Sequence, residues 1–213
     1  MGKRKTFVVL GLPASGKGTQ AEILAEKVGA EIIGVGNLVR VEIEQGNSQS
    51  RRFKKIKENY DKGIPQEDEL TEELFDQAVA KSKGNLIFDN YPFSANQFLF
   101  FQELLKKYNF ELPKIIYIKI DPESAISRIK TRLVCDRCKF VYLSGNVGDN
   151  CQKCSGKLIK RSDDMPKIMQ ERVNFAQPRI DLVIEKFKSI GQVFEIDGEK
   201  PIPDVSAQID KVI

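Results

Sequence analysis

Short apolar runs alternate along the chain with longer stretches in which apolar residues recur every three or four positions. The short runs predict strands at residues 6–12, 31–33, 86–90, 114–120 and 192–197. The longer stretches predict helices at residues 19–28, 37–46, 48–62, 67–81, 95–108, 122–133 and 202–213. Because the strands lack polar alternation, both faces of their sheet should be covered. The pattern predicts an α/β fold with a five-stranded parallel sheet and helices on both faces.

Two segments interrupt this alternation. Residues 37–82 carry three predicted helices and no strand, and residues 134–161 carry four cysteines with little helical pattern. We therefore predict a core made of residues 1–36, 83–133 and 162–213, which carries these two segments as insertions. A long helical tract runs from Asp163 to Ile190 and is predicted to break near Pro178.

The composition limits the chemistry that the protein can perform. Its 213 residues include no histidine, which excludes imidazole acid–base catalysis, a Ser-His-Asp triad and histidine metal ligands. The net charge of +4 is too small to indicate a nucleic-acid partner, but it suits a small polyanionic ligand. No apolar run approaches the ~20 residues of a membrane span. The apolar part of the start, MGKRKTFVVLGLP, is too short for a signal peptide, so we expect a cytoplasmic protein without a membrane partner.

The stretch GLPASGKGTQ, residues 11–20, fits the pattern G-x-x-x-x-G-K between a predicted strand and a predicted helix. In that context a glycine-rich loop presents backbone N–H groups and a helix N-terminus to a phosphate group, and Lys17 adds a full positive charge. The alternative is a glycine-rich strand-to-helix turn without a ligand. Gly18 follows Lys17 where most such loops have Ser or Thr, which argues against a GTPase or a motor ATPase.

The four cysteines form two C-x-x-C pairs, Cys135 with Cys138 and Cys151 with Cys154. In a cytoplasmic protein this spacing predicts a closed, structural zinc site with four cysteine ligands. Two disulfides or an iron–sulfur cluster are the alternatives. Four thiolates leave no open coordination position, so the metal should stiffen its segment without taking part in chemistry.

The form G-x-P-x-x-G-K-G-T-Q resembles the adenylate kinase family of nucleoside monophosphate kinases, and the resemblance extends over essentially the whole chain. Five further segments carry it: GVGNLVR at 34–40, GIPQ at 63–66, DNYPFSANQ at 89–97, the set Arg128, Arg132, Arg161, Asp163, Asp164 and Arg172, and DGEKP at 197–201. The resemblance implies that residues 37–82 are a helical insertion that binds the acceptor monophosphate. It also implies that residues 134–161 form a small, mobile, zinc-ribbon-like lid, which carries zinc in some family members.

The resemblance also implies roles for individual residues. The implied catalytic residues are Lys17, Asp89, Arg132, Arg161 and Arg172, and Asp89 would hold Mg²⁺ through water. The implied ATP-binding residues are Ala14, Ser15, Gly16, Lys17, Gly18, Thr19, Arg128, Arg132, Val141, Tyr142 and Lys200. The implied acceptor-binding residues are Val35, Arg40, Ile64, Pro65, Gln66, Asn90, Tyr91, Phe93, Gln97, Arg161 and Arg172. Taken singly, each arginine is also typical of a solvated helix face.

The predicted acceptor site departs from the family pattern. Asn90 stands where the family has Gly, and Phe93 stands where the family has the Arg that grips the acceptor phosphate. Losing such a contact forfeits roughly 1.5–3 kcal/mol. Val35 and Asn37 replace a Thr and an Asp, and Ala14 replaces a glycine in the phosphate loop. Taken alone, residues 88–97 also fit a plain strand-to-helix turn with a hydrophobic staple.

Basic residues in the same insertion could compensate for the missing arginine, although a solvated helix face explains them equally well. They are Arg51, Arg52, Lys54 and Lys55. We expect a monomeric, ATP-dependent nucleoside monophosphate kinase that acts on AMP. The alternatives are a kinase for UMP, CMP or another monophosphate, and a nucleotide-binding regulator with weak turnover. Gln97 is a plausible reader of the base, but one glutamine does not choose among bases.

Overall fold

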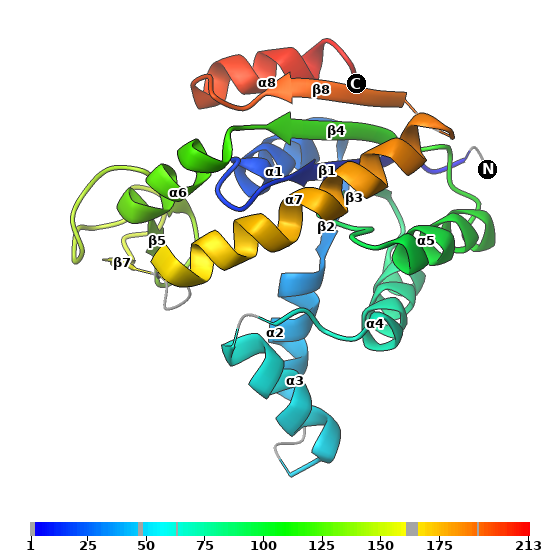
Figure 1. The fold of residues 1–213 in the computed structure, drawn as a ribbon, viewed down its shortest axis with the longest axis horizontal. Helices are drawn as coiled ribbons and strands as arrows, with labels where there is room; N and C mark the ends of the chain where they lie inside the picture. The colour runs from blue at the N-terminus through cyan, green and yellow to red at the C-terminus, as the bar shows by residue number, and fades with distance from the viewer. Residues whose placement is uncertain (1–2, 47–48, 63, 161–165, 191) are drawn as a thin grey trace.

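The computed structural model describes residues 3–46, 49–62, 64–160, 166–190 and 192–213. Five strands, β1 (Thr6–Gly11), β2 (Ala30–Gly34), β3 (Asn85–Asp89), β4 (Lys114–Lys119) and β8 (Gln192–Asp197), form one parallel sheet in the order β2-β3-β1-β4-β8 (Figure 1). All five predicted strands are confirmed. The register places Val9 and Gly34 beside Asp89, so the carboxyl ends of three strands meet at one edge.

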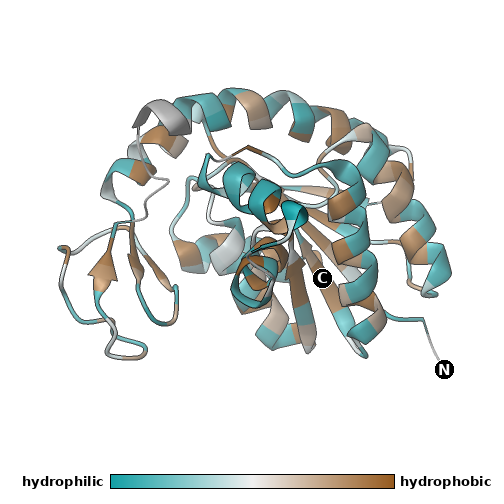
Figure 2. Cartoon of the chain, turned by 90° about the horizontal axis from the view of Figure 1, so that it is seen from below, coloured by the Kyte–Doolittle hydropathy of each residue, from teal (hydrophilic) through white to brown (hydrophobic). Residues whose placement is uncertain are grey.

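Helices cover both faces of this sheet, as the apolar strands predict. On one face, α1 (Lys17–Val28) and α8 (Ile202–Asp210) pack on strand residues such as Val9, Ile116 and Ile196. On the other face, α5 (Ala95–Lys107), α6 (Pro122–Thr131) and α7 (Pro166–Lys188) pack on residues such as Phe88 and Tyr117. Figure 2 shows the apolar strands enclosed by helices whose outer surfaces are more polar.

Helix α7 runs without a break through Pro178, which corrects the predicted interruption there. A proline inside a helix costs about 3 kcal/mol through one lost backbone hydrogen bond and a steric clash. Apolar side chains on both sides of it, from Val173 to Phe187, are buried in the core. Each fully buried apolar side chain contributes roughly 1.5–3 kcal/mol, so packing on both sides of the proline outweighs its cost.

Between β2 and β3 the chain forms α2 (Val35–Gln45), α3 (Arg51–Asp61) and α4 (Asp68–Lys81), as predicted. These helices share a small core of their own, built on Val39, Ile56 and Leu74. In Figure 1, α2 and α3 extend away from the sheet, whereas α4 returns to it beside α5. Phe75 and Val79 of α4 accordingly join the main core.

The cysteine segment, predicted as a small zinc-ribbon-like lid, forms a second, antiparallel sheet whose individual strands the hydrophobic pattern did not predict. Its strands are β5 (Leu133–Cys135), β6 (Val141–Tyr142) and β7 (Leu158–Ile159), in the order β6-β5-β7. Strands of two or three residues are too short to show a hydrophobic period. The segment has its own small core, which includes Leu133, Leu158 and two of the cysteines. Within the described residues, no helix is long and apolar enough to cross a membrane.

Candidate functional site

The glycine-rich loop lies between the end of β1 and the start of α1, where the sequence predicts it. A Cβ atom on Gly11 would lie 2.5 Å from Ser15 Oγ and 2.7 Å from the Ile118 carbonyl oxygen, so only glycine fits there. Gly16 caps α1 with a φ of 90°, and the helix has no acidic residue in its first turn. The N-terminus of α1 is therefore available to an anion. Lys17 begins the helix, and its Nζ donates to the Leu12 carbonyl at 3.3 Å.

Ala14 adopts a φ of 62°, in the left-handed region that favours glycine. This residue replaces a glycine of the family's phosphate loop, so its φ shows whether the loop keeps a conformation that glycine favours. The backbone thus keeps a glycine-like conformation even though the side chain is present. A residue other than glycine pays roughly 1–2 kcal/mol for this conformation.

Arg128 on α6 connects this loop to the turn after β8. Its guanidinium donates to the Ala14 carbonyl at 3.5 Å and to the Gly198 carbonyl at 2.8 Å, and it pairs with Glu199 at 3.2 Å. Lys200, in the same turn, is exposed and lies 3.9 Å from Asp197. Arg128 and Lys200, both predicted to bind ATP, are therefore brought to one side of the phosphate loop.

Asp89 ends β3 at the edge where β1 and β2 also end. Its Oδ1 is buried and has no hydrogen-bond partner among the described residues. Burial raises the pKa of Asp89 above its ordinary value, and the positive charges of Lys17 and Arg40 oppose that rise. Lys17 comes from the phosphate loop and Arg40 from α2, so the carboxylate lies between the predicted donor and acceptor sides. An unsatisfied carboxylate oxygen in this position fits a Mg²⁺ ion that keeps most of its waters.

Asn90 explains how the acceptor-side turn accommodates the loss of a glycine. Its φ is 55°, and its N–H donates to the Val9 carbonyl at 2.8 Å. Asn enters the left-handed region more readily than most residues, so the turn keeps the geometry that glycine would give. Asn90 therefore replaces the family's glycine without a change in the local backbone conformation that glycine favours.

Tyr91 and Phe93 have different surroundings. The Tyr91 side chain is fully buried and stacks on Phe75 with ring centroids 3.8 Å apart. Desolvation, together with the nearby carboxylates of Glu72 and Asp68, raises the pKa of Tyr91. Its ring is thus a core element, and its hydroxyl is buried without a hydrogen-bond partner among the described residues. The predicted contact of Tyr91 with the acceptor remains a prediction. Phe93 is half-buried, packs against the main core and lies 6.3 Å from the Phe175 ring.

Gln97 is 7% exposed, and its side-chain amide is bonded within the protein at both ends. Its Oε1 accepts from the Phe93 N–H at 2.8 Å, and its Nε2 donates to Asp68 Oδ1 at 2.7 Å. This arrangement leaves one N–H and one lone pair for a base.

The other predicted acceptor residues surround α2 and the start of α4. Val35 packs between the main core and the small core of the insertion, and Arg40 is half-buried. Ile64 and Pro65 are exposed, whereas Gln66 donates to the Ile56 carbonyl at 3.0 Å. These three residues form the short connection from α3 to α4, so their predicted contact with the acceptor remains a prediction.

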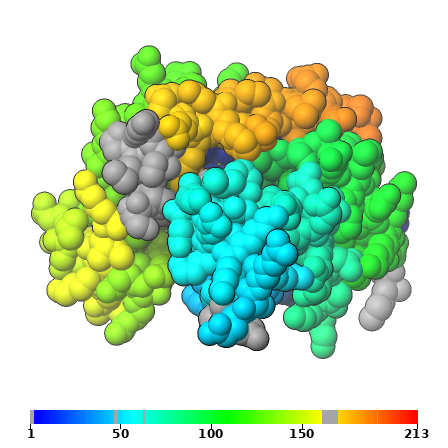
Figure 3. Space-filling model, turned by 60° about the horizontal axis from the view of Figure 1, so that its bottom comes forward, coloured from blue at the N-terminus to red at the C-terminus, as the bar shows by residue number. Residues whose placement is uncertain are grey.

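Three predicted charged residues, Arg161, Asp163 and Asp164, lie outside the described residues. Arg132 follows α6 and is 9% exposed, and Arg172 is half-buried on α7. In the space-filling view a hollow opens between α7 and the acceptor helices, and its floor has the dark blue of the N-terminal part of the chain (Figure 3). The phosphate loop belongs to that part of the chain.

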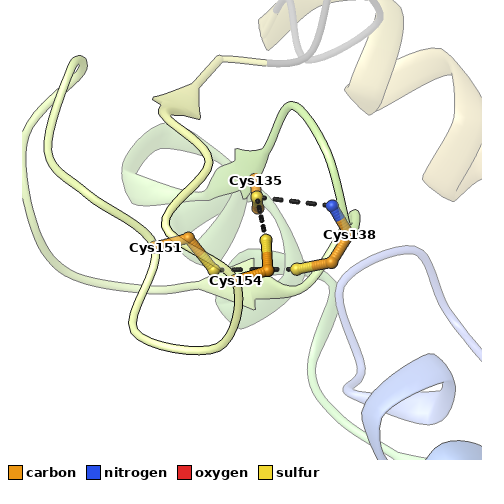
Figure 4. Close-up of side chains that lie close together, drawn as sticks. All are labelled: Cys135, Cys138, Cys151 and Cys154. Carbon is orange, nitrogen blue, oxygen red and sulfur yellow. Dashed lines mark hydrogen bonds between the residues drawn. The ribbon is translucent and has the colours of Figure 1, made fainter.

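The four cysteines converge, as the C-x-x-C pairs predict (Figure 4). Their sulfur atoms all lie within 4.8 Å of one another, with Cys135 and Cys154 at 3.4 Å and Cys138 and Cys151 at 3.6 Å. These separations exclude S–S bonds, and all four thiols are free. A tetrahedral zinc ion with Zn–S bonds of about 2.3 Å places its ligands about 3.8 Å apart, so the cluster fits zinc.

Backbone geometry favours negative charge on this cluster. The N–H groups of Arg137 and Cys138 point at Cys135 Sγ, each at 3.4 Å, as the N–H of Lys153 does at Cys151 Sγ. A Cβ atom on Gly156 would lie 2.6 Å from Cys135 Sγ, so the chain can pass the cluster there only as glycine. The C-x-x-C-x-G pattern in residues 151–156 could have signalled this requirement from the sequence.

Tyr142 belongs to the surroundings of the cluster. Its hydroxyl accepts from the Gln152 N–H at 2.9 Å and lies within hydrogen-bond distance of Cys151 Sγ, at 3.3 Å. The hydrogen bond with Tyr142, together with the backbone N–H groups of Lys153 and Cys154, lowers the pKa of Cys151 below its ordinary value. Val141 and Tyr142 are half-buried on β6, and their predicted contact with ATP remains a prediction.

Two residues without a predicted role of their own help to hold the site. Glu199 pairs with Arg128 and also accepts from the Asp121 N–H at 2.9 Å, which ties the turn after β8 to the start of α6. Asp68 binds Gln97 and Ser94. Asp68 has no recognisable signal in one sequence, because a carboxylate at the start of a helix is also typical of a simple favourable dipole interaction. Glu199 lies in the DGEKP segment, but one sequence does not show that it pairs with Arg128.

The comparisons with known proteins agree with this geometry. The sequence model of the adenylate kinase family matches residues 9–192. The chain is 34% identical over 205 residues to the adenylate kinase of Fervidobacterium nodosum, covering 93% of both chains. It is 31% identical over 209 residues to that of Acetivibrio thermocellus, covering 95% of both, and 32% identical over 207 residues to that of Thermococcus sibiricus, covering 95% of this chain and 91% of the relative. The chain therefore belongs to the adenylate kinase family and is a phosphotransferase of the nucleoside monophosphate kinase class, whose substrates are nucleotides.

Proposed function

We propose that this kinase transfers the γ-phosphoryl group of ATP to AMP and yields two molecules of ADP. The observation that carries the proposal is the position of Asp89 at the end of β3, between β1, which leads to Lys17, and β2, which leads to Arg40. Phosphoryl transfer needs charge neutralisation and in-line alignment more than covalent work by the protein. A site in which one carboxylate lies between two cations from the donor and acceptor sides suits that requirement.

The proposed roles of the residues follow from their charges. Lys17 neutralises the β- and γ-phosphates, and Arg132, Arg161 and Arg172 stabilise the charge that develops on the transferred group. The other residues predicted for ATP and for the acceptor bind the two nucleotides on either side. Residues 37–82 act as the acceptor-binding unit, and residues 134–161 act as a lid that excludes water.

We further propose one catalytic and one structural metal ion. Asp89 holds Mg²⁺ through water, and the ion supplies charge stabilisation on the transferred phosphoryl group when ATP is bound. Cys135, Cys138, Cys151 and Cys154 hold zinc, which stabilises a lid with only a small apolar core. We also infer that the protein acts as a monomer in the cytoplasm, where ATP is plentiful and thiols remain reduced, and that it has neither nucleic-acid nor membrane partners.

The acceptor is tested by a panel of monophosphates. Purified protein is assayed with ATP and Mg²⁺ against AMP, GMP, CMP and UMP, with ADP formation followed by a coupled reaction. We expect the highest kcat/KM for AMP. A higher kcat/KM for CMP or UMP would show that the acceptor is a pyrimidine nucleotide instead of AMP. Tight ATP binding without turnover on any acceptor would instead indicate a nucleotide-binding regulator.

The structural metal is tested by composition and by mutation. Elemental analysis should find one zinc ion per chain, and Cys138→Ser should lower both the zinc content and the melting temperature. Ser144→Ala, at an exposed position of the same segment, serves as the control that should change neither. A protein that contains no metal and has all four thiols oxidised would contradict the proposed zinc site.

A further inference from the structure

A closed hydrogen-bond network joins the first residue of α4 to the start of α5. Both carboxylate oxygens of Asp68 take part, because Oδ1 accepts from Gln97 Nε2 at 2.7 Å and Oδ2 accepts from Ser94 Oγ at 3.1 Å. Ser94 Oγ also accepts from the Gln97 N–H at 3.1 Å, which caps α5. The network lies beside Phe93, the residue at which the acceptor site departs from the family pattern.

The network determines which way the Gln97 amide faces. Its carbonyl oxygen faces the N–H of Phe93, a donor, and its NH2 group faces the Asp68 carboxylate, which when ionised can only accept. Rotating the amide by half a turn would place two donors against each other at Phe93 and two acceptors against each other at Asp68. Because the side chain is 7% exposed, water offers little compensation for those clashes. One orientation is therefore strongly favoured.

An amide that cannot turn offers a base its donor and its acceptor in one order only. Adenine presents an amino donor at C6 beside the N1 acceptor, and cytosine presents the same order at C4 and N3. Hypoxanthine and uracil present the reverse order, with an oxo acceptor beside an N–H donor. A glutamine that is free to turn satisfies both orders, whereas an amide of fixed orientation leaves buried polar groups unpaired with one of them.

We propose that Asp68 is a positioning residue that fixes the orientation of Gln97 and thereby makes the acceptor site select 6-amino over 6-oxo nucleobases. This inference rests on the proposed AMP kinase activity for its direction. It assigns the discrimination between bases to the Asp68 carboxylate, which acts by binding the Gln97 amide and not by contacting the nucleotide.

The structure provides a matched control on the same two helices. Asp76, two turns further along α4, accepts from Lys107 Nζ at 2.7 Å and from the Tyr108 hydroxyl at 3.0 Å. It therefore also connects α4 with the end of α5, but at a distance from Gln97 along both helices. If Asp68 served only to hold the helices together, Asp76→Ala would have the same consequences as Asp68→Ala.

The test compares AMP with inosine 5′-monophosphate, which differ in the order of donor and acceptor at C6 and N1. For the parent, Asp68→Ala, Asp68→Asn and Asp76→Ala, kcat/KM is measured with saturating ATP, and Kd is measured by calorimetry. We expect Asp68→Ala to lower the AMP-to-inosine-monophosphate ratio by roughly tenfold. Asp68→Asn should retain most of the ratio, since its amide oxygen still accepts from Gln97, and Asp76→Ala should leave the ratio unchanged.

An unchanged ratio in Asp68→Ala, or an equal loss in Asp76→Ala, would overturn the proposal. If Asp68→Ala does not fold, Asp68→Ser replaces it, because a hydroxyl can donate or accept and so permits both amide orientations. The CMP and UMP pair separates this proposal from the proposed acceptor. Preference for CMP over AMP would show that AMP is not the acceptor. The positioning role of Asp68 would then be tested by whether Asp68→Ala lowers the CMP-to-UMP ratio by a similar factor. If the parent distinguishes neither AMP from inosine monophosphate nor CMP from UMP, by turnover or by Kd, the proposed role of Asp68 is refuted.

Discussion

Two turns follow the carboxyl ends of β1 and β3, and they differ in how closely their residues match the family pattern. Each contains a non-glycine residue in the left-handed region, Ala14 with φ 62° and Asn90 with φ 55°. The donor turn keeps its cation, Lys17, but the acceptor turn has Phe93 in place of an arginine. Backbone geometry has thus been maintained on both sides, whereas charge has been maintained on one.

The comparison shows that a backbone conformation tolerates substitution more easily than a charge does. Asn90 enters the left-handed region at little cost, and Ala14 pays a strain of roughly 1–2 kcal/mol that a folded domain of this size can carry. A missing cation has no such local substitute, because its replacement must come from another element. On the acceptor side we propose that Arg40, Arg161 and Arg172 together supply the charge that Phe93 lacks.

The donor side should be the more sensitive of the two. Lys17→Met removes the one charged residue of the phosphate loop, so phosphoryl transfer should fall by about 100- to 1,000-fold while the fold is retained. Lys27→Met, at the exposed end of the same helix and paired with Asp210, should stay within about threefold of the parent. Coupled assays and melting curves measure both. Near-parental activity in Lys17→Met would refute the assignment of the loop.

Asp89 should show opposite effects on activity and stability. Asp89→Asn should lower turnover by about 10- to 100-fold, because the metal loses its carboxylate. The raised pKa of Asp89 means that the folded, nucleotide-free protein binds this proton more tightly than the unfolded chain does. Its contribution to stability is thus present at acid pH and is lost as the pH rises through the folded pKa.

Because Asn does not titrate, the melting temperature of nucleotide-free Asp89→Asn should exceed that of the parent by a margin that grows from acid to neutral pH. Melting curves of both proteins at several pH values measure this difference. A margin that is constant or shrinks with pH would show that burial does not raise the pKa of Asp89.

Restoring the missing cation tests the acceptor side. Phe93→Arg combined with Asn90→Gly should lower the acceptor KM by up to about tenfold and leave the ATP KM unchanged, because the phosphate loop is untouched. Glycine at position 90 suits the observed φ and removes a buried Asn90 Oδ1 that has no partner among the described residues. Asn90→Gly alone is the control. A double variant that binds AMP no better than the parent would show that Phe93 belongs to a remodelled pocket.

The sequence predicted those features that depend on local pattern. The five strands and the order of helices follow from hydrophobic period, and the phosphate loop and the cysteine cluster follow from short motifs with fixed spacing. The continuous helix through Pro178 could not be predicted, because packing from distant elements outweighs the local cost of proline. The bonds from Asp68 to Gln97 and from Glu199 to Arg128 join residues far apart in sequence, and no local pattern marks such pairs.

The smallest expected effect concerns the strain that Ala14 carries in the donor turn. Ala14→Gly should raise the stability of the nucleotide-free protein by about 1 kcal/mol, since glycine adopts a φ of 62° without a steric penalty. The melting temperature should rise by roughly 2–4 °C. Ala80→Gly, at an exposed position in the last turn of α4, should have the opposite sign, because a helix favours alanine over glycine by up to about 1 kcal/mol. If both variants lose stability equally, the left-handed conformation of Ala14 costs nothing, and the two turns differ in charge alone.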